Sequence, residues 1–246
     1  MINAILTTFS RIQKVFTKNL VMKYGLTSML LLFTLLEVTA QKTYLKSSDS
    51  DPKAKKILDA LKKEYNGYKA MEISFELILE LKGQAPETQK GKLIQQGKKY
   101  FVSVSDQEVY CDGKTVWLHQ KANKEVQINS FEEGPGADMM SPSEMLRMYE
   151  SGQYAYAITG NATENGTKVT QIEFKPLDKN SEYSKIRLSV AENTNKATSI
   201  KVFSKDGSRY TLNVKSIVPN KTYAPEIFVF NAKQHPGVHI EDLRID

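Results

Sequence analysis

The chain has 246 residues, with 34 basic and 28 acidic side chains and a formal net charge of +6. Lysine is interspersed with glutamate and aspartate along the whole sequence, whereas nucleic-acid binding requires a basic surface concentrated in one place. The composition therefore indicates a soluble globular protein and argues against a nucleic-acid partner.

The first 40 residues are predicted to be an N-terminal extension and a signal peptide. Residues 22–40 contain a lysine near the start, an apolar stretch of about a dozen residues and a small-residue site ending at Ala40, which is the order of a cleaved secretory signal. Residues 1–21 are either an upstream extension of the reading frame or an unusually long n-region. Cleavage after Ala40 leaves 206 residues with 30 basic and 27 acidic side chains, a size that fits one domain.

Gln41 follows the predicted cleavage point, where a lipid-attached bacterial protein has the cysteine that receives its acyl groups. We therefore expect an exported protein that is not itself lipidated, which excludes cytoplasmic nucleotide chemistry. Cys111 is the only cysteine, so no internal disulfide forms. Its apolar neighbours predict a small buried side chain rather than a reactive thiol.

After a polar linker, residues 41–50, we expect one domain spanning residues 51–246. Asp51 is a typical helix N-cap, and Pro52 suits the first helical position. Apolar residues then recur at helical spacing and predict a helix that docks on an apolar surface. They are Ala54, Ile57, Leu58, Leu61 and Tyr65.

Most of the chain beyond residue 70 reads as strands. In residues 71–81 every odd position is apolar, which is typical of a strand with one wet face. Asp112-Gly113 is a tight hairpin signal between two strands, and the short turns favour an antiparallel sheet. The predicted strands are 71–81, 88–96, 99–105, 107–111, 114–120, 125–129, 153–159, 168–175, 184–190, 198–203, 209–217 and 226–230.

One further helix is predicted between the strands. Residues 141–144 combine an N-cap serine, a proline and a glutamate in a capping-box pattern, and apolar residues follow from Met145 to Tyr149. The resulting fold class is α+β, mainly β, with about ten or eleven strands, two helices and a strongly curled antiparallel sheet covered on its concave side.

No catalytic residues, cofactor site or metal site are predicted. Pro236-Gly237 separates His235 from His239 and prevents a helix that would align the two rings, so we expect exposed loop histidines. The third histidine is His119. The glutamates of residues 72–80 lie at even positions of the predicted strand, on its solvent face. They do not form the isolated pair of carboxylates that acid–base catalysis uses.

The concave apolar face has two interpretations. It is either ordinary core under two helices or a lipid cavity with the helices as a lid, and periodicity alone does not separate them.

Three stretches of the chain resemble the outer-membrane lipoprotein carrier family (LolA-like proteins). The hairpin 111–117 resembles that family's DGK-T-aliphatic-Trp hairpin, and Phe228-Val229-Phe230 followed by residues 236–242 is similar to its closing segment. The Phe75 strand, leading through Gly91-Lys92-Leu93 to Lys99-Tyr100, has the same order and spacing. The similarity runs from about residue 52 to the end of the chain.

The resemblance implies an unclosed (half) antiparallel β-barrel with a helical lid. Its interior would shelter the acyl chains of lipoproteins, which the family carries through the periplasm from an inner-membrane ABC release complex to an outer-membrane acceptor. The protein is expected to be a monomer. The candidate cavity residues are Ile73, Phe75, Leu77, Leu79, Leu93, Tyr100, Val102, Val104, Val116 and Leu118, and the candidate lid contacts are Met145, Leu146 and Tyr149.

The sequence departs from the family at one place. The family often has a strand arginine that latches the lid, with an aromatic residue a few positions on; here Lys98 and Lys99 occupy the stretch. A lysine offers a point charge without the planar guanidinium fork. Tyr100 matches the aromatic position by strand parity, with Phe101 one step away.

Two other functions remain open at this level. One is a periplasmic sensor or adaptor of lipoproteins built on a similar half-barrel. The other is a lipid-modifying enzyme that uses the few histidines. A membrane-bound acceptor of the same fold is disfavoured by Gln41.

Overall fold

The computed structural model describes residues 46–132 and 147–244. These ranges contain the helix α2 (Pro52–Asn66), four short 3-10 helices and twelve strands. The 3-10 helices are η2 (Ser47–Asp49), η3 (Met148–Glu150), η4 (Pro225–Phe228) and η5 (Ala232–Gln234). The strands are β1 (Met71–Glu80), β2 (Glu87–Gln96), β3 (Lys99–Val104), β4 (Gln107–Cys111), β5 (Thr115–Gln120), β6 (Glu125–Ser130), β7 (Tyr154–Glu164), β8 (Thr167–Pro176), β9 (Tyr183–Ala191), β10 (Ala197–Ser204), β11 (Arg209–Pro219) and β12 (His239–Asp242).

The helix α2 begins where the sequence predicts. The Asp51 side chain accepts a hydrogen bond from the Lys53 backbone N–H at 2.8 Å, and Pro52 stands first in the helix. One stripe of the helix is buried, as its period requires: Ala54, Leu58, Leu61 and Tyr65. Within the described part of the chain, no helix has both the length and the hydrophobicity that crossing a membrane requires.

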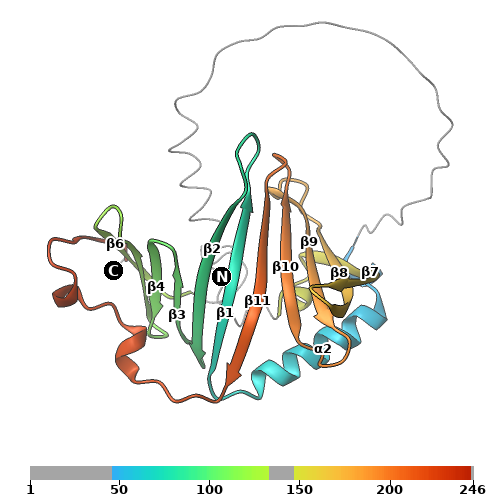
Figure 1. Ribbon diagram of the computed structural model, residues 1–246, viewed down its shortest axis with the longest axis horizontal. Coiled ribbons are helices and arrows are strands. Elements are labelled where there is room, and N and C mark those ends of the chain that lie inside the picture. The colour runs from blue at the N-terminus through green and yellow to red at the C-terminus, as the bar shows by residue number, and fades with distance from the viewer. Residues whose placement is uncertain (1–45, 133–146, 245–246) are drawn as a thin grey trace, which may run out of the picture.

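All twelve strands form one sheet in the order β12-β6-β5-β4-β3-β2-β1-β11-β10-β9-β8-β7. Neighbouring strands are antiparallel except for β12, which lies parallel to β6. The sheet ends at β12 on one side and β7 on the other, so it does not close on itself. Figure 1 shows α2 running beneath the half of the sheet that holds β11 to β7. The predicted unclosed, mainly antiparallel half-barrel is confirmed.

The strand predictions hold except at the C-terminus. The predicted strand 226–230 is wrong, because Pro225 starts the 3-10 helix η4 there. Phe228 and Phe230 are nevertheless buried, whereas Val229 between them is 40% exposed, which explains the strand-like alternation.

The twelfth strand lies instead at residues 239–242. All four of its residues are exposed, so it has no apolar face that a sequence pattern would reveal. It takes the place of the wrongly predicted strand 226–230, and with β1 to β11 it makes twelve strands, against the expected total of about ten or eleven.

The predicted second helix begins outside the described residues, because positions 133–146 are not among them. Of its apolar face, Met148 and Tyr149 belong to η3. Met145 and Leu146 fall in the undescribed range.

The core occupies the concave face of the sheet. Alternate residues of β1 from Met71 to Leu79 are buried, whereas those between them are only partly buried. These side chains join inward residues from β2 to β5 and β8 to β11, and the stripe of α2, in one continuous cluster. The cluster therefore spans nearly the whole width of the sheet on one face.

Candidate functional site

The ten candidate cavity residues all point to the concave face and belong to this cluster. Each is at most 8% exposed, and Phe75 and Leu93 are only 1% exposed. Four come from β1 and the other six from β2, β3 and β5. In this structure these ten side chains are thus closed to water.

Gly91 creates the room that one of these side chains occupies. Gly91 lies opposite Phe75 in the β1–β2 ladder. A Cβ atom at Gly91 would lie 2.3 Å from the Phe75 ring and 2.9 Å from a Val104 methyl group. The ring therefore lies directly across the glycine, which accounts for the Gly91-Lys92-Leu93 stretch noted in the sequence.

The aromatic residue at the start of β3 is assigned by strand parity. Tyr100 is buried with the concave cluster, and its ring lies 6.5 Å from that of Phe131. Phe101 points to the opposite face, where its ring lies 5.0 Å from that of Tyr110. Lys98 and Lys99 are both exposed at the β2–β3 turn, outside the cluster.

The other half of the apolar face was not among the candidate residues. It comes from β8 to β11, and the same two-residue alternation that identified β1 is present in those strands. The missed residues include Ile172, Phe174, Ile186, Leu188, Val190, Val202, Tyr210 and Leu212. Any ligand bound on the concave face has both halves of the sheet available.

Tyr149, one of the predicted lid residues, connects η3 to α2. It is 5% exposed, and its hydroxyl donates to the Asp59 carboxylate at 2.7 Å. Lys55 also donates to Asp59, at 2.8 Å. The hydrogen bond from Lys55, followed by that from Tyr149, lowers the pKa of Asp59, while burial raises the pKa of Tyr149.

A second polar contact joins the same two segments. Lys62 of α2 pairs with Glu150 of η3 at 2.6 Å, and both side chains are partly exposed. Partly exposed ion pairs contribute little net stability. This ion pair therefore adds little to the partly buried Tyr149–Asp59 hydrogen bond that joins η3 to the helix.

The N-terminal end of α2 is fastened to the sheet through backbone groups. The Asp51 N–H donates to the Tyr156 carbonyl at 2.8 Å, and the Tyr156 N–H donates to the Ser50 hydroxyl at 3.1 Å. Near the other end, the Asn220 N–H donates to the Ala70 carbonyl at 2.6 Å. The helix is thus tethered at both ends, and its buried stripe packs between the tethers.

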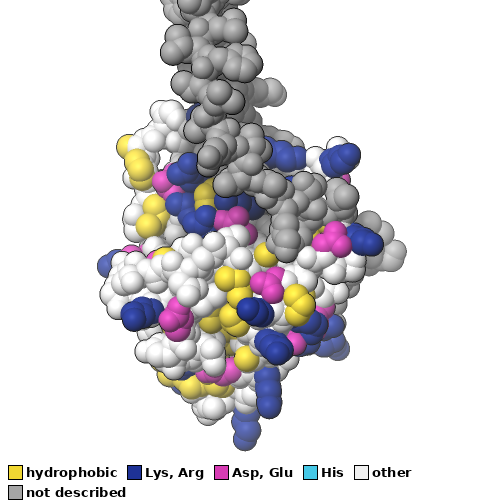
Figure 2. Space-filling view, turned by 90° about the vertical axis from the view of Figure 1, so that its right-hand side faces the viewer, with side chains coloured by type: hydrophobic (Ala, Val, Ile, Leu, Met, Phe, Trp, Pro, Cys, Tyr) yellow, Lys and Arg dark blue, Asp and Glu magenta, His cyan; other side chains and the backbone are white. Residues whose placement is uncertain are grey.

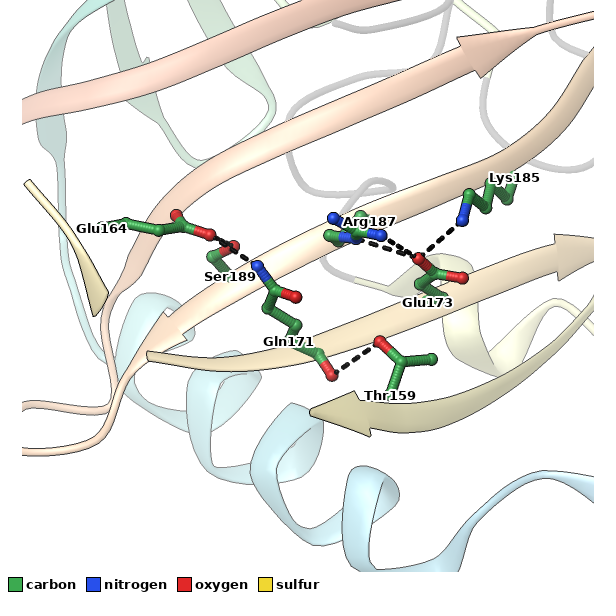
Figure 3. Close-up of polar contacts among 7 residues, drawn as sticks. All are labelled: Thr159, Glu164, Gln171, Glu173, Lys185, Arg187 and Ser189. Carbon is green, nitrogen blue, oxygen red and sulfur yellow. Dashed lines mark hydrogen bonds and ion pairs between the residues drawn. The ribbon is translucent and has the colours of Figure 1, made fainter. Parts of the chain in front are cut away.

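Carboxylates on the convex face are engaged by basic or hydroxyl groups. Glu173 of β8 accepts hydrogen bonds from Lys185 and Arg187 of β9, and these partners lower its pKa against the opposing effect of burial (Figure 3). Glu164 accepts from Ser189 at 2.9 Å and from Gln171 at 2.8 Å. These acids therefore join neighbouring strands through ion pairs and hydrogen bonds.

Acidic and basic side chains are also mixed on the surface. On the face drawn in Figure 2, basic side chains are interspersed with acidic and apolar ones. The glutamates of β1 predicted to face solvent follow the same pattern, since Glu76 pairs with Lys215 at 2.7 Å and Glu80 with Lys201 at 3.0 Å.

Cys111 is buried and unpaired, as predicted. Burial raises the pKa of its thiol to about 11, so the thiol is protonated and unreactive at neutral pH.

Residues 66–231, more than half of the chain, match the family described as outer membrane lipoprotein carrier protein LolA. A search of curated protein sequences finds no significant match.

One solved structure shares the fold at low sequence identity, and two others are similar at lower TM-scores. An uncharacterized conserved protein from Thermus thermophilus is 9% identical, with a TM-score of 0.51, over 78% of this chain and 99% of that chain. A LolA superfamily protein from Nitrosomonas europaea is 11% identical, with a TM-score of 0.38, over 72% and 97%. The Pseudomonas aeruginosa MucA/MucB complex contains a chain that is 14% identical, with a TM-score of 0.39, over 74% of this chain and 62% of that chain.

Proposed function

Because the chain belongs to the outer membrane lipoprotein carrier family (LolA), we propose that it is a periplasmic chaperone for lipoproteins. It would bind their acyl chains on the concave face of the sheet and carry them from the inner to the outer membrane. The family consists of carrier proteins, whose activity is binding rather than catalysis.

One observation carries this proposal. The apolar cluster extends across nearly the whole concave face, from β1 to β5 and from β8 to β11. A continuous apolar face of this width offers an acyl chain a surface on which to lie once its cover opens.

The size of the apolar cargo explains why a closed carrier is needed. A sixteen-carbon acyl chain has about fifteen methylenes worth roughly 0.8 kcal/mol each, so sheltering one is worth on the order of 12 kcal/mol. Direct release into water would be very slow. Transfer would therefore run between two sheltered sites, and the free energy used to open the cover would weaken retention enough to allow it.

The test compares two glutamate substitutions at adjacent positions of β1. Leu77 is 2% exposed on the concave face, whereas Ile78 is partly buried on the convex face. Leu77→Glu is expected to abolish co-purification of acylated lipoprotein from the periplasm, and Ile78→Glu to preserve it. Circular dichroism and the melting temperature establish that both variants are folded.

A second measurement uses the wild-type protein and does not depend on the folding of any variant. The same lipoprotein is offered with and without its acyl groups, and binding is measured by calorimetry. We expect binding only of the acylated form. Equal binding of both forms, or loss of cargo in Ile78→Glu but not in Leu77→Glu, contradicts the proposal.

A further inference from the structure

The C-terminal segment packs against the convex face of β3 to β5, on the side opposite the apolar cluster. Phe228 is 1% exposed and Phe230 is 8% exposed. The Phe230 ring lies 5.8 Å from that of Tyr110 and 5.1 Å from that of His119. The segment is therefore anchored by aromatic rings before it reaches β12.

Three metal-ligating side chains meet under this segment. Glu108 of β4 and His119 of β5 are direct cross-strand partners, and His235 follows η5. One donor atom from each of the three lies within 4.8 Å of the other two. His119 is only 3% exposed, so the cluster is formed at a buried position rather than by chance on an open surface.

The backbone and the neighbouring rings hold His235 in place. Its N–H donates to the Ala232 carbonyl at 3.1 Å, and its carbonyl accepts from the Val238 N–H at 3.2 Å. Its ring stacks on Phe230 with centroids 5.0 Å apart, and lies edge to face with His119 at 4.5 Å. The imidazole is thus positioned before any ligand arrives.

We propose that Glu108, His119 and His235 form a binding site for a divalent transition-metal ion, with Zn²⁺ as the fitting ion. Two imidazoles and one carboxylate are a donor set that Zn²⁺ accepts in proteins. Bonds of about 2.0–2.1 Å in tetrahedral geometry place two ligand atoms about 3.3 Å apart. His119 Nδ1 and Glu108 Oε2 lie 3.2 Å apart.

Of the two groups that contact Glu108, one favours binding of the ion and the other competes with it. The Tyr110 hydroxyl donates to Oε2 at 2.8 Å and orients the carboxylate, as partners of metal-binding carboxylates commonly do. Lys121 pairs with Oε1 at 2.6 Å and competes with a cation for this carboxylate. The Lys121 side chain is 39% exposed, so it is able to turn into solvent when the ion binds.

The site would cross-link the sheet to the C-terminal segment, because His235 lies 116 positions beyond His119 in the chain. A bound ion would therefore stabilise the attachment of residues 225–242 to β4 and β5. The site goes beyond the carrier function proposed above, since it lies on the other face of the sheet and involves none of the cavity residues.

The experiment measures Zn²⁺ binding to the purified, chelator-treated protein by calorimetry and by competition with a chromogenic chelator. We expect one ion per chain with a Kd of about 10 μM or tighter. At a free concentration about 100 times Kd, the melting temperature should rise by roughly 5–10 °C. Co²⁺ should give the visible absorption of a tetrahedral site.

Three variants locate the ion. His235→Ala removes a partly buried ligand and should weaken binding by about tenfold or more. The control is His239→Ala, at an exposed histidine in β12, which should leave the Kd unchanged. Lys121→Gln removes the competing cation and should tighten binding.

Each contrary result overturns the proposal. Absence of binding at about 100 μM Zn²⁺ does so directly. Equal weakening by His235→Ala and His239→Ala would place the ion at another site. Because these histidines are not needed to shelter an acyl chain, loss of Zn²⁺ binding with retained lipoprotein binding separates this inference from the carrier function.

Discussion

Replacement of Gly91 by alanine should destabilise the protein through the concave cluster. The new Cβ would lie 2.3 Å from the Phe75 ring, whereas carbon atoms pack favourably at about 3.5–4.0 Å. The ring must therefore move by more than about 1 Å, but it is only 1% exposed and closely surrounded. Overpacking of this kind costs about 1–3 kcal/mol, which corresponds to a fall in melting temperature of about 2–12 °C.

The assay is urea unfolding of Gly91→Ala beside a matched control, Gly160→Ala in β7. A Cβ at Gly160 meets no atom within 4 Å, so the control should change the free energy of unfolding by less than about 0.5 kcal/mol. Replacing Phe75 with leucine should remove most of the clash, so the double variant should be less destabilised than the sum of the two single variants. Wild-type stability of Gly91→Ala, or strict additivity in the double variant, would refute the packing of this ring across the glycine.

Other predictions concern the lid contact, the convex ion pairs and the thiol. Tyr149→Phe should remove the hydrogen bond to Asp59 and increase hydrogen–deuterium exchange in residues 147–150, at a cost of about 0.5–1.5 kcal/mol in unfolding free energy; unchanged exchange would show that this bond does not hold the segment. Against the opposing effect of burial, hydrogen bonds from Lys185 and Arg187 lower the pKa of Glu173 from its usual 4.5. The ionised Glu173 carboxylate therefore stabilises the fold above pH 4.5, and this stabilisation is lost as the pH falls through the lowered pKa. Glu173→Gln should therefore be less stable than wild type at pH 7, and this difference should shrink in acid unfolding measurements, whereas a constant difference would contradict the argument. Cys111 should resist alkylation at pH 8 until the protein unfolds, because its thiol pKa is about 11; rapid labelling of the folded protein would be the contrary result.

The two faces of the sheet have different roles in this description. The concave face carries the apolar cluster, and the convex face carries ion pairs and the packed C-terminal segment. Successive side chains of a strand point to opposite faces, so one strand contributes to both. In β5, for example, Leu118 belongs to the concave cluster and His119 to the convex histidine pair.

Local chemistry was sufficient to predict most of the elements. The Asp51-Pro52 start of α2, the alternation of β1 and the Asp112-Gly113 turn depend on neighbours within a few residues, and the structure confirms all three. The positions of the ten candidate residues on one face follow from the same two-residue period. That these residues line a cavity remains a prediction, because the strand periodicity shows which face a side chain occupies but not what that face binds.

Contacts between distant parts of the chain were decided only by the tertiary structure. Phe228-Val229-Phe230 alternates like a strand, yet it forms no ladder, because the local proline favours a 3-10 turn and the two rings dock on β3 to β5. His235 appeared to be one of two loop histidines near the C-terminus, but its ring contacts that of His119 from β5. Sequence periodicity reports the face that a residue occupies within its own element, whereas a site built from three separated segments depends on how those segments pack together.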